Sequence, residues 1–239
     1  MATPMLVWSG PDSAAADKLD VPTGTLIAKL PCIGTGGCQQ VVAAGLSAAL
    51  ANAGVADPGG ALYMAGFSAG HGANDSLFGS EEVAGRARAY LSFDSYYAGA
   101  TPPGILSVAQ RAAAGEVVMI STTSNPAGAS WRTCEQAIQP LLAQLDLQQV
   151  GMPAALAGLK PATRVLNRGL YWHFAFEGTY VHGDHANVIA PAISRWVFEE
   201  LLPASEGAVQ DAGAKGVAAV FAAVGAFFAA KWWWRRRRP

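Results

Sequence analysis

The sequence predicts an α/β fold with a doubly wound, mostly parallel sheet of about six strands. Short apolar runs, bounded by Gly, Pro or Ser, are typical of strands that are buried on both faces. Longer Ala- and Leu-rich segments lie between these runs and are expected to be helices. Strands that alternate with helices predict βαβ units with right-handed crossovers. With 239 residues, the chain is long enough for one sizeable core.

The expected elements follow one another along residues 1–202, which we take as one domain. The predicted strands are Met5–Trp8, Thr25–Leu30, Leu62–Ala65, Ala89–Phe93, Val117–Ser121 and Leu170–Phe176. The predicted helices are Gln39–Ala53, Glu81–Arg88, Val108–Ala114, Arg132–Gln149 and Val188–Leu202. A linker of small residues is expected at 203–215. Residues 216–239 then form an apolar helix with a tryptophan belt and an arginine-rich tail.

The composition argues against two classes of protein. Hydrophobic residues make up 51% of the chain and charged residues 14%, which is too apolar for a disordered protein. The apolar residues are also too interspersed for a polytopic membrane protein. The net charge of −1 conceals an asymmetry, because five of the 16 basic residues lie after residue 230. The body of the chain is therefore mildly acidic, and the basic signal belongs to its last residues.

One motif carries chemistry. The predicted strand Leu62–Ala65 runs directly into Gly66-Phe-Ser68-Ala-Gly70, a Gly-x-Ser-x-Gly pattern, and the residues that follow can open a helix. A sharp turn from strand to helix needs small residues on either side of the serine. Such a turn exposes the Ser68 hydroxyl as a nucleophile and directs the amide of Ala69 toward a developing oxyanion. The alternative is an ordinary glycine-rich turn.

The arrangement around this motif resembles the α/β-hydrolase family. Leu6–Gly10 stands where that family has the strand leading to its oxyanion loop, and Leu26–Pro31 resembles the next strand. The resemblance covers Met5 to Leu202, with the family's first two strands missing, as in its smaller members. It implies a second oxyanion donor from the backbone at Gly10. A plain turn at the strand end is the alternative for that position.

The family supplies its catalytic base from the loop after the last strand, and two histidines stand there. His185 lies directly before the last helix, the family's usual place, so we expect it to be the base. His182 is the alternative and is otherwise expected to orient the loop. His173 lies inside a strand and is expected in the core, and His71 is expected to shape the pocket.

The acid of the triad is less clearly marked. The family usually places it after the strand that here is Val117–Ser121, but the following Thr122-Thr-Ser-Asn-Pro contains no carboxylate. Asp94 follows the preceding strand, a position that some members use, and we expect it to orient the histidine. Its alternative role is to cap the turn after the strand.

The three cysteines and the histidine pair do not predict a metal site. Cys32 and Cys38 flank Ile-Gly-Thr-Gly-Gly and can either close a small loop or remain as thiols, the state we expected. His182 and His185 with Asp184 between them would be compatible with a metal, but no further ligands stand nearby. We therefore predicted neither a metal nor a cofactor.

The C-terminal residues suggest attachment to a membrane. Fifteen residues without charge, 216–230, precede Lys231, the tryptophans of 232–234 and four arginines. An apolar run, an aromatic belt and a cationic end are typical of a membrane-spanning segment, so a membrane partner was expected through 216–234. The sequence does not indicate on which side of the membrane the body would lie. The alternative is an Ala-rich helix buried in a homo-oligomer, followed by a basic tail. Nucleic acid was the less favoured partner.

These observations together predict a serine hydrolase that cleaves an ester or similar acyl bond through an acyl-enzyme intermediate. Ser68, His185 and Asp94 are its expected triad, with Ala69 and Gly10 as oxyanion donors, and the substrate is a small or lipid-like acyl compound. The rival is a protein that keeps this fold without turnover. It would serve as a structural or binding component tethered by its tail, for instance in a virus particle.

Overall fold

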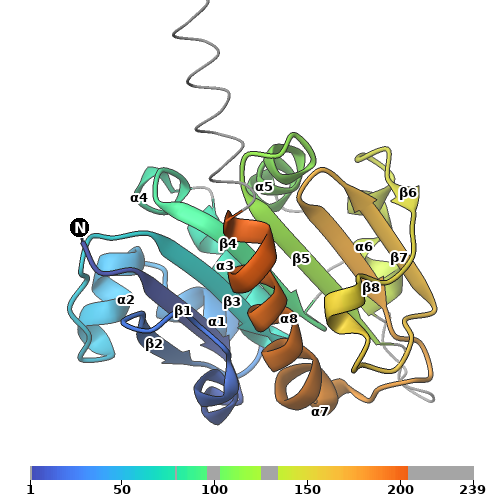
Figure 1. Cartoon of the computed structure of the whole chain (residues 1–239). Coiled ribbons are helices and arrows are strands. Elements are labelled where there is room, and N and C mark those ends of the chain that lie inside the picture. Colours follow the sequence, from blue (N-terminus) through green and yellow to red (C-terminus); the bar gives the residue numbers. More distant parts are fainter. Residues whose placement is uncertain (1, 79, 96–102, 125–133, 204–239) are drawn as a thin grey trace, which may run out of the picture. The chain divides into compact units, whose positions relative to one another are not determined.

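The computed structural model describes residues 2–78, 80–95, 103–124 and 134–203 (Figure 1). The chain divides into two units, Met1–Leu202 and Pro203–Pro239. Apart from Pro203, the second unit lies outside the described residues, as do the predicted linker and the apolar C-terminal helix.

The first unit has an α/β fold with one mixed, mostly parallel sheet, so the predicted class is confirmed. The described strands lie in the order β2-β1-β3-β4-β5-β8-β7-β6. They are β1 Met5–Gly10, β2 Leu26–Pro31, β3 Leu62–Phe67, β4 Ala87–Phe93, β5 Val118–Thr123, β6 Gln148–Gln149, β7 Arg164–Arg168 and β8 Tyr171–Ala175. The first six strands in the spatial order pair in parallel, whereas β7 and β6 are antiparallel. The sheet therefore has eight described strands, and our expectation of about six was wrong.

Helices cover both faces of this sheet (Figure 1). They are α1 Thr35–Val41, α2 Leu46–Asn52, α3 His71–Phe78, α4 Glu81–Ala84, α5 Pro103–Ala113, α6 Cys134–Leu142, α7 His182–Asp184 and α8 Ala190–Trp196. Alternating side chains of the parallel strands enter two separate core layers. Met5 and Val7 pack with α1, α2, α3, α5 and α6, while Leu6 and Trp8 pack with α8. This two-sided burial explains why the strands have continuously apolar sequences.

The two strands that we did not predict lack an apolar run. β7 has the sequence Arg-Val-Leu-Asn-Arg, and β6 consists of two exposed glutamines that fell inside the predicted helix Arg132–Gln149. The observed helix α6 ends at Leu142, and Asp146 then adopts a positive φ of 47°. A left-handed residue interrupts helical geometry, so the chain leaves the helix before it reaches β6.

The direction of winding reverses between β1 and β3. The chain moves from β1 outward to β2, and then returns to place β3 on the other side of β1. In open α/β sheets, ligands bind outside the carboxyl ends of the strands at such a switch point. Gly10 ends β1 and Ser68 directly follows β3, so both residues lie at this edge.

The expected membrane attachment is corrected by the structure. Across the ranges that the structure describes, we find no helix with both the length and the apolarity needed to cross a bilayer. The segment on which that expectation was based, 216–239, lies outside these ranges.

Candidate active site

Ser68 occupies a strained turn between β3 and α3. Its φ is +56°, in the left-handed region that residues other than glycine seldom adopt. The 3₁₀ turn Ser68–Gly70 joins the strand directly to the helix. A serine in this conformation at a strand-to-helix junction has the backbone geometry of a nucleophile elbow.

The two glycines of the motif are required by close packing, against a side chain at Gly66 and against backbone at Gly70. A Cβ atom at Gly66 would lie 2.4 Å from Nδ2 of Asn74, and one at Gly70 would lie 2.1 Å from the carbonyl oxygen of Ser9. The buried Ser9 hydroxyl donates toward the carbonyl oxygen of Gly70 at 3.1 Å. The end of β1 is thus fastened to the turn that carries Ser68.

The expected oxyanion residues lie on either side of this junction. Ala69 is the middle residue of the turn. Gly10 approaches from β1, and a Cβ atom there would lie 2.6 Å from the carbonyl oxygen of Phe67, the residue before Ser68. The structure therefore brings the backbones of Gly10 and Ala69 to the same end of β3.

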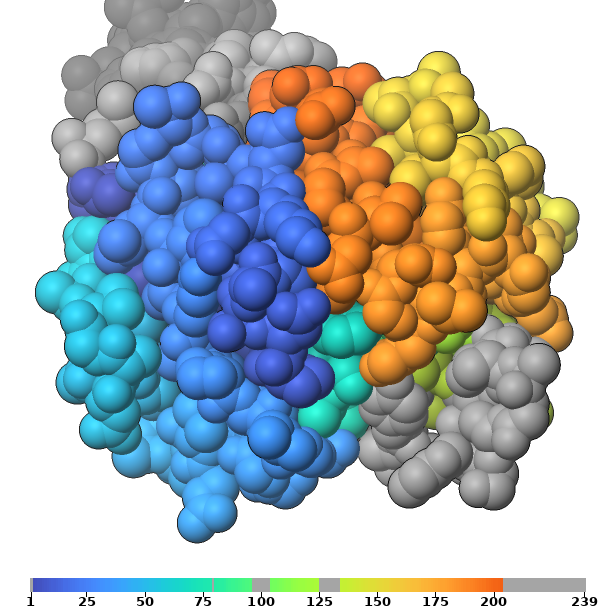
Figure 2. Space-filling model, turned by 90° about the horizontal axis from the view of Figure 1, so that it is seen from below, coloured from blue at the N-terminus to red at the C-terminus, as the bar shows by residue number. Residues whose placement is uncertain are grey.

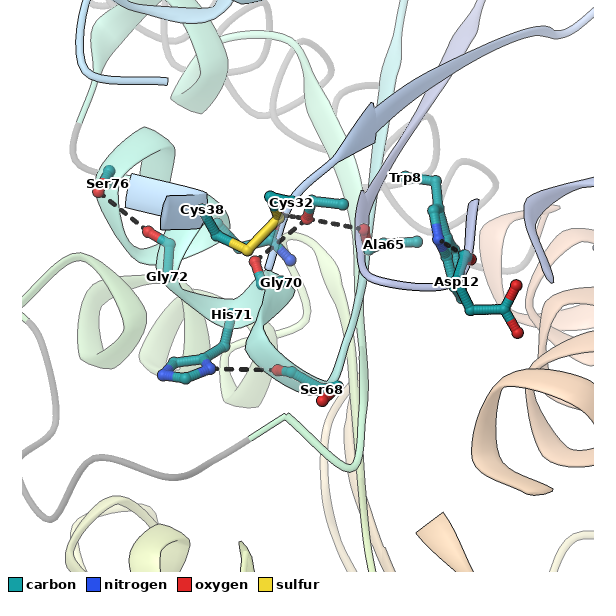
Figure 3. Close-up of a disulfide and its surroundings, with 12 residues drawn as sticks. Trp8, Asp12, Cys32, Cys38, Ala65, Ser68, Gly70, His71, Gly72 and Ser76 are labelled. Carbon is teal, nitrogen blue, oxygen red and sulfur yellow. Dashed lines mark hydrogen bonds between the residues drawn. A yellow bond between two sulfur atoms is a disulfide. The ribbon is translucent and has the colours of Figure 1, made fainter. Parts of the chain in front are cut away.

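A disulfide joins Cys32 to Cys38 beside the elbow, so the loop-closing alternative holds and the expected thiols are not found. Figure 3 shows the disulfide next to the start of α3. The same loop approaches the helix closely, because a Cβ atom at Gly72 would lie 2.5 Å from the carbonyl oxygen of Thr35. The loop after β2 therefore supports the start of α3.

Asp94 forms its histidine pair with His182. Oδ2 of Asp94 lies 2.6 Å from Nδ1 of His182. The backbone N–H of Ser124 donates to Oδ1 at 2.7 Å, and the Ser124 hydroxyl donates to Oδ2. The carboxylate is almost wholly buried and has a hydrogen-bond donor on each oxygen.

These hydrogen bonds keep Asp94 ionised. Burial alone would raise the pKa of Asp94, but the hydrogen bond with His182, the charge of His185 and the bonds from Ser124 outweigh it. The pKa falls to about 2. At neutral pH, Asp94 is therefore a carboxylate that can hold one tautomer of His182.

His182 lies next to the elbow and is open to solvent. Its ring stacks on that of Phe67 at a centroid distance of 4.6 Å, and 37% of its side chain is exposed. Phe67 directly precedes Ser68 in the chain, so this stacking places the imidazole against the residue before the serine. The Asp184 carboxylate accepts a hydrogen bond from the N–H of Val181 at 3.0 Å and so fixes the start of α7.

His185, the expected base, lies in the core. Its side chain is fully buried, and its Nδ1 lies 2.7 Å from the hydroxyl oxygen of Thr122. Burial lowers the pKa of His185 to about 4, because the apolar surroundings disfavour the imidazolium. Helical structure begins at His182, so His185 already belongs to the helix and faces inward. The expected pairing of Asp94 with His185 thus differs from the structure, in which Asp94 contacts His182.

The other two histidines, His71 and His173, have other partners in the described contacts. Nδ1 of His71 lies 3.2 Å from the carbonyl oxygen of Ser68, and burial lowers its pKa. His173 is buried between Ser121, at 2.9 Å, and Glu135, at 3.0 Å. It is a core residue, as expected, but it belongs to a polar network that the sequence did not reveal.

Ser124 and Thr122 were missed as candidate site residues. The sequence drew attention to their loop only because it lacks a carboxylate. A strand end with four consecutive hydroxyl residues, 121–124, was the available signal, since hydroxyls beside a parallel strand end can support a carboxylate on the next strand.

Figure 2 looks onto the edge where the parallel strands end, and teal atoms from the part of the chain near residue 70 are visible there between blue and orange segments. Within the described ranges, no group of three or more His, Cys, Asp or Glu side chains is placed to hold a metal ion.

Comparison with known proteins gave no match. No family model matches the sequence, and no curated protein and no solved structure is significantly similar to it.

Proposed function

We propose that this protein is a serine hydrolase of the α/β-hydrolase type that cleaves an ester or similar acyl bond. Ser68 is its nucleophile, His182 its base and Asp94 its acid. The observation that carries the proposal is the 2.6 Å pair between Asp94 and His182, whose imidazole stacks on Phe67, the residue before the left-handed Ser68 at the switch point of the sheet.

The chemistry follows from the tautomer of His182. Because the ionised Asp94 accepts a hydrogen bond from the Nδ1–H of His182, Nε2 keeps its lone pair and is the atom that can take a proton from Ser68. The Ser68 oxygen then attacks the carbonyl carbon and forms a tetrahedral intermediate. The backbone amides of Ala69 and Gly10 are our candidates to stabilise its oxyanion.

His182 also serves as the acid that completes the first half of the reaction and as the base of the second half. The imidazolium of His182 gives its proton to the leaving alcohol, and an acyl-enzyme remains on Ser68. His182 then deprotonates a water molecule, which attacks the acyl carbon. The bond to the Ser68 oxygen breaks, the imidazolium returns its proton to that oxygen, and the acid is released. The buried Asp94 stabilises the imidazolium during both halves without itself being protonated.

A fluorophosphonate probe tests the proposal directly, because it labels only an activated serine. The wild-type protein should be labelled and should hydrolyse p-nitrophenyl esters, and a series of chain lengths would define the acyl group. Ser68→Ala should abolish labelling and lower hydrolysis by several orders of magnitude.

Ser76→Ala, on the helix α3 that follows the elbow, is the matched control. The Ser76 hydroxyl donates to the carbonyl oxygen of Gly72 within α3 at 3.0 Å and takes no part in the proposed reaction. The Ser76→Ala variant should be labelled by the probe to the same extent as the wild type. If the folded wild-type protein is not labelled, the proposal fails, and the rival, a structural or binding protein without turnover, becomes the better account.

A further inference from the structure

The backbone of Asp94 needs external support. Its φ is +45°, which is disfavoured for any residue with a Cβ atom and costs on the order of 1 kcal/mol. Asp94 directly follows β4, so a relaxed backbone would turn its carboxylate in a different direction. The contact with His182 therefore depends on whatever holds Asp94 in this conformation.

Thr122 on β5 holds Asp94 from the neighbouring strand. The N–H of Asp94 donates to the carbonyl oxygen of Thr122 at 2.9 Å, and it also lies 3.3 Å from the Thr122 hydroxyl oxygen. Two acceptors on one residue thus fix the direction of the Asp94 amide. The second acceptor works only if the hydroxyl keeps its lone pair toward Asp94.

His185 determines how that hydroxyl is oriented. Its Nδ1 lies 2.7 Å from Oγ1 of Thr122, and both side chains are wholly buried, so water cannot replace either partner. If the hydroxyl proton is donated to Nδ1, the lone pairs of Thr122 remain free for Asp94. In the opposite tautomer, the hydroxyl proton would have no acceptor. The first arrangement leaves fewer buried groups unsatisfied.

Packing alone does not account for an imidazole at this position. His185 lies among apolar side chains, with its ring edge-on to Phe176 at a centroid distance of 5.9 Å. Its Nε2 is buried without a hydrogen-bond partner, and such a polar atom destabilises the folded state. A phenylalanine of similar volume would fill the space without that cost.

We propose that Thr122 and His185 are a positioning pair that holds Asp94 in the backbone conformation from which its carboxylate reaches His182. Neither residue touches the substrate. This inference rests on the proposed function for its effect on turnover, but the geometry of the Asp94–His182 contact can be measured independently.

The test combines kinetics with proton NMR of the full chain. Thr122→Val removes the hydroxyl at nearly constant volume, and Thr122→Ser is the matched control that keeps it. The expected result for Thr122→Val is a 10- to 100-fold lower kcat with KM within about twofold of the wild type. The downfield imidazole N–H resonance from His182 should also weaken or shift. Thr122→Ser should restore both readouts to near wild-type values.

His185→Phe provides a second route to the same link and guards against a Thr122 variant that does not fold. It should change both readouts in the same direction. Combined with Thr122→Val it should add little, because the two residues act through one contact.

Wild-type kcat and an unchanged resonance in folded Thr122→Val would overturn the inference. A lower kcat with an unchanged resonance would also overturn it, because the effect would then bypass Asp94 and His182. Failure of the proposed function itself would be seen separately. In that case the probe would not label the wild-type protein, but the His182 resonance would still differ between the wild type and Thr122→Val.

Discussion

At the scale of single residues, three positions separate two histidines with different environments. His182 is the first residue of α7 and is partly exposed beside Phe67, whereas His185 is one helical turn further and fully buried. Both lie close enough to Asp94 to influence the pKa of its carboxyl group. Only His182 combines a contact with Asp94 and access to solvent, and a base that meets a substrate needs both.

This difference predicts the outcome of replacing the residues of the pair. His182→Ala should lower kcat/KM by at least about a thousandfold, because nucleophile and base act as a unit. Asp94→Asn should lower kcat by about 10²- to 10⁴-fold, because an amide can hold the wrong tautomer of His182. Steady-state hydrolysis of a p-nitrophenyl ester measures both effects.

Asp146→Asn is the control for the aspartate change. Asp146 also has a positive φ, of 47°, but its side chain is 94% exposed and contacts only Arg168 in the described hydrogen bonds. Because asparagine tolerates the left-handed region, both variants should fold. Normal turnover in His182→Ala would show that another group is the base, and normal turnover in Asp94→Asn would remove Asp94 from the triad.

At the scale of elements, the sequence was informative wherever burial alone fixes the structure. Continuous apolar runs located six strands, because a parallel strand covered on both faces must be apolar throughout. β6 and β7 lie at one end of the sheet, where this requirement is relaxed, and they were missed. The Gly-x-Ser-x-Gly pattern located the turn at Ser68, because a side chain at either glycine would collide with a close neighbour, Asn74 or Ser9.

The partner of Asp94 could not be read from the sequence in the same way. The choice between His182 and His185 depends on where helical structure begins, and both residues precede an amphipathic segment. The relevant contacts also join positions 88 residues apart, from Asp94 to His182. A single sequence gives no local signal for such a pairing.

The contact between β1 and the elbow leads to a prediction about Gly70. In Gly70→Ala, the new Cβ atom would meet the backbone of Ser9 at 2.1 Å, and neither β1 nor the turn can move without disturbing the sheet. We expect the free energy of unfolding to fall by about 2–4 kcal/mol, with loss of activity. Urea unfolding monitored by circular dichroism measures the stability.

Gly36→Ala is the matched control. Gly36 lies in α1, its φ is not positive, and a Cβ atom there would meet nothing within 4 Å. Alanine is the better helix former, so this variant should be as stable as the wild type or more so. Equal stability of the two variants would show that β1 does not pack against the elbow as described.

At the scale of the whole molecule, two partly buried carboxyl groups make the stability depend on pH in opposite directions. Asp57 forms an ion pair with Arg86 at 2.7 Å, and its hydrogen bond with that arginine lowers its pKa. Asp75 on α3 is different, because burial raises its pKa to about 7. It lines a small cavity with Tyr90 and Ser92, whose buried hydroxyls have no hydrogen-bond partner. Unlike Asp94, Asp75 accepts no hydrogen bond from the described residues that lowers its pKa, so burial is the effect that remains.

The sign of the Asp75 effect follows from proton binding. Between its unfolded pKa of 3.8 and its folded pKa of about 7, the folded state holds a proton that the unfolded state has lost. Asp75 therefore destabilises the fold increasingly as the pH rises through this range, and the effect is complete above pH 7. Asp75→Asn should remove this loss, so its melting temperature should exceed that of the wild type by more at pH 8 than at pH 5.

Asp57→Asn is the control. It should lower the melting temperature by a similar amount at pH 5 and pH 8, because the pKa of Asp57 lies below both values. Thermal melts followed by circular dichroism at the two pH values measure these differences. If the difference in melting temperature between Asp75→Asn and the wild type is the same at pH 5 and pH 8, the Asp75 carboxyl group ionises without destabilising the fold. The cavity beside α3 would then solvate the carboxylate.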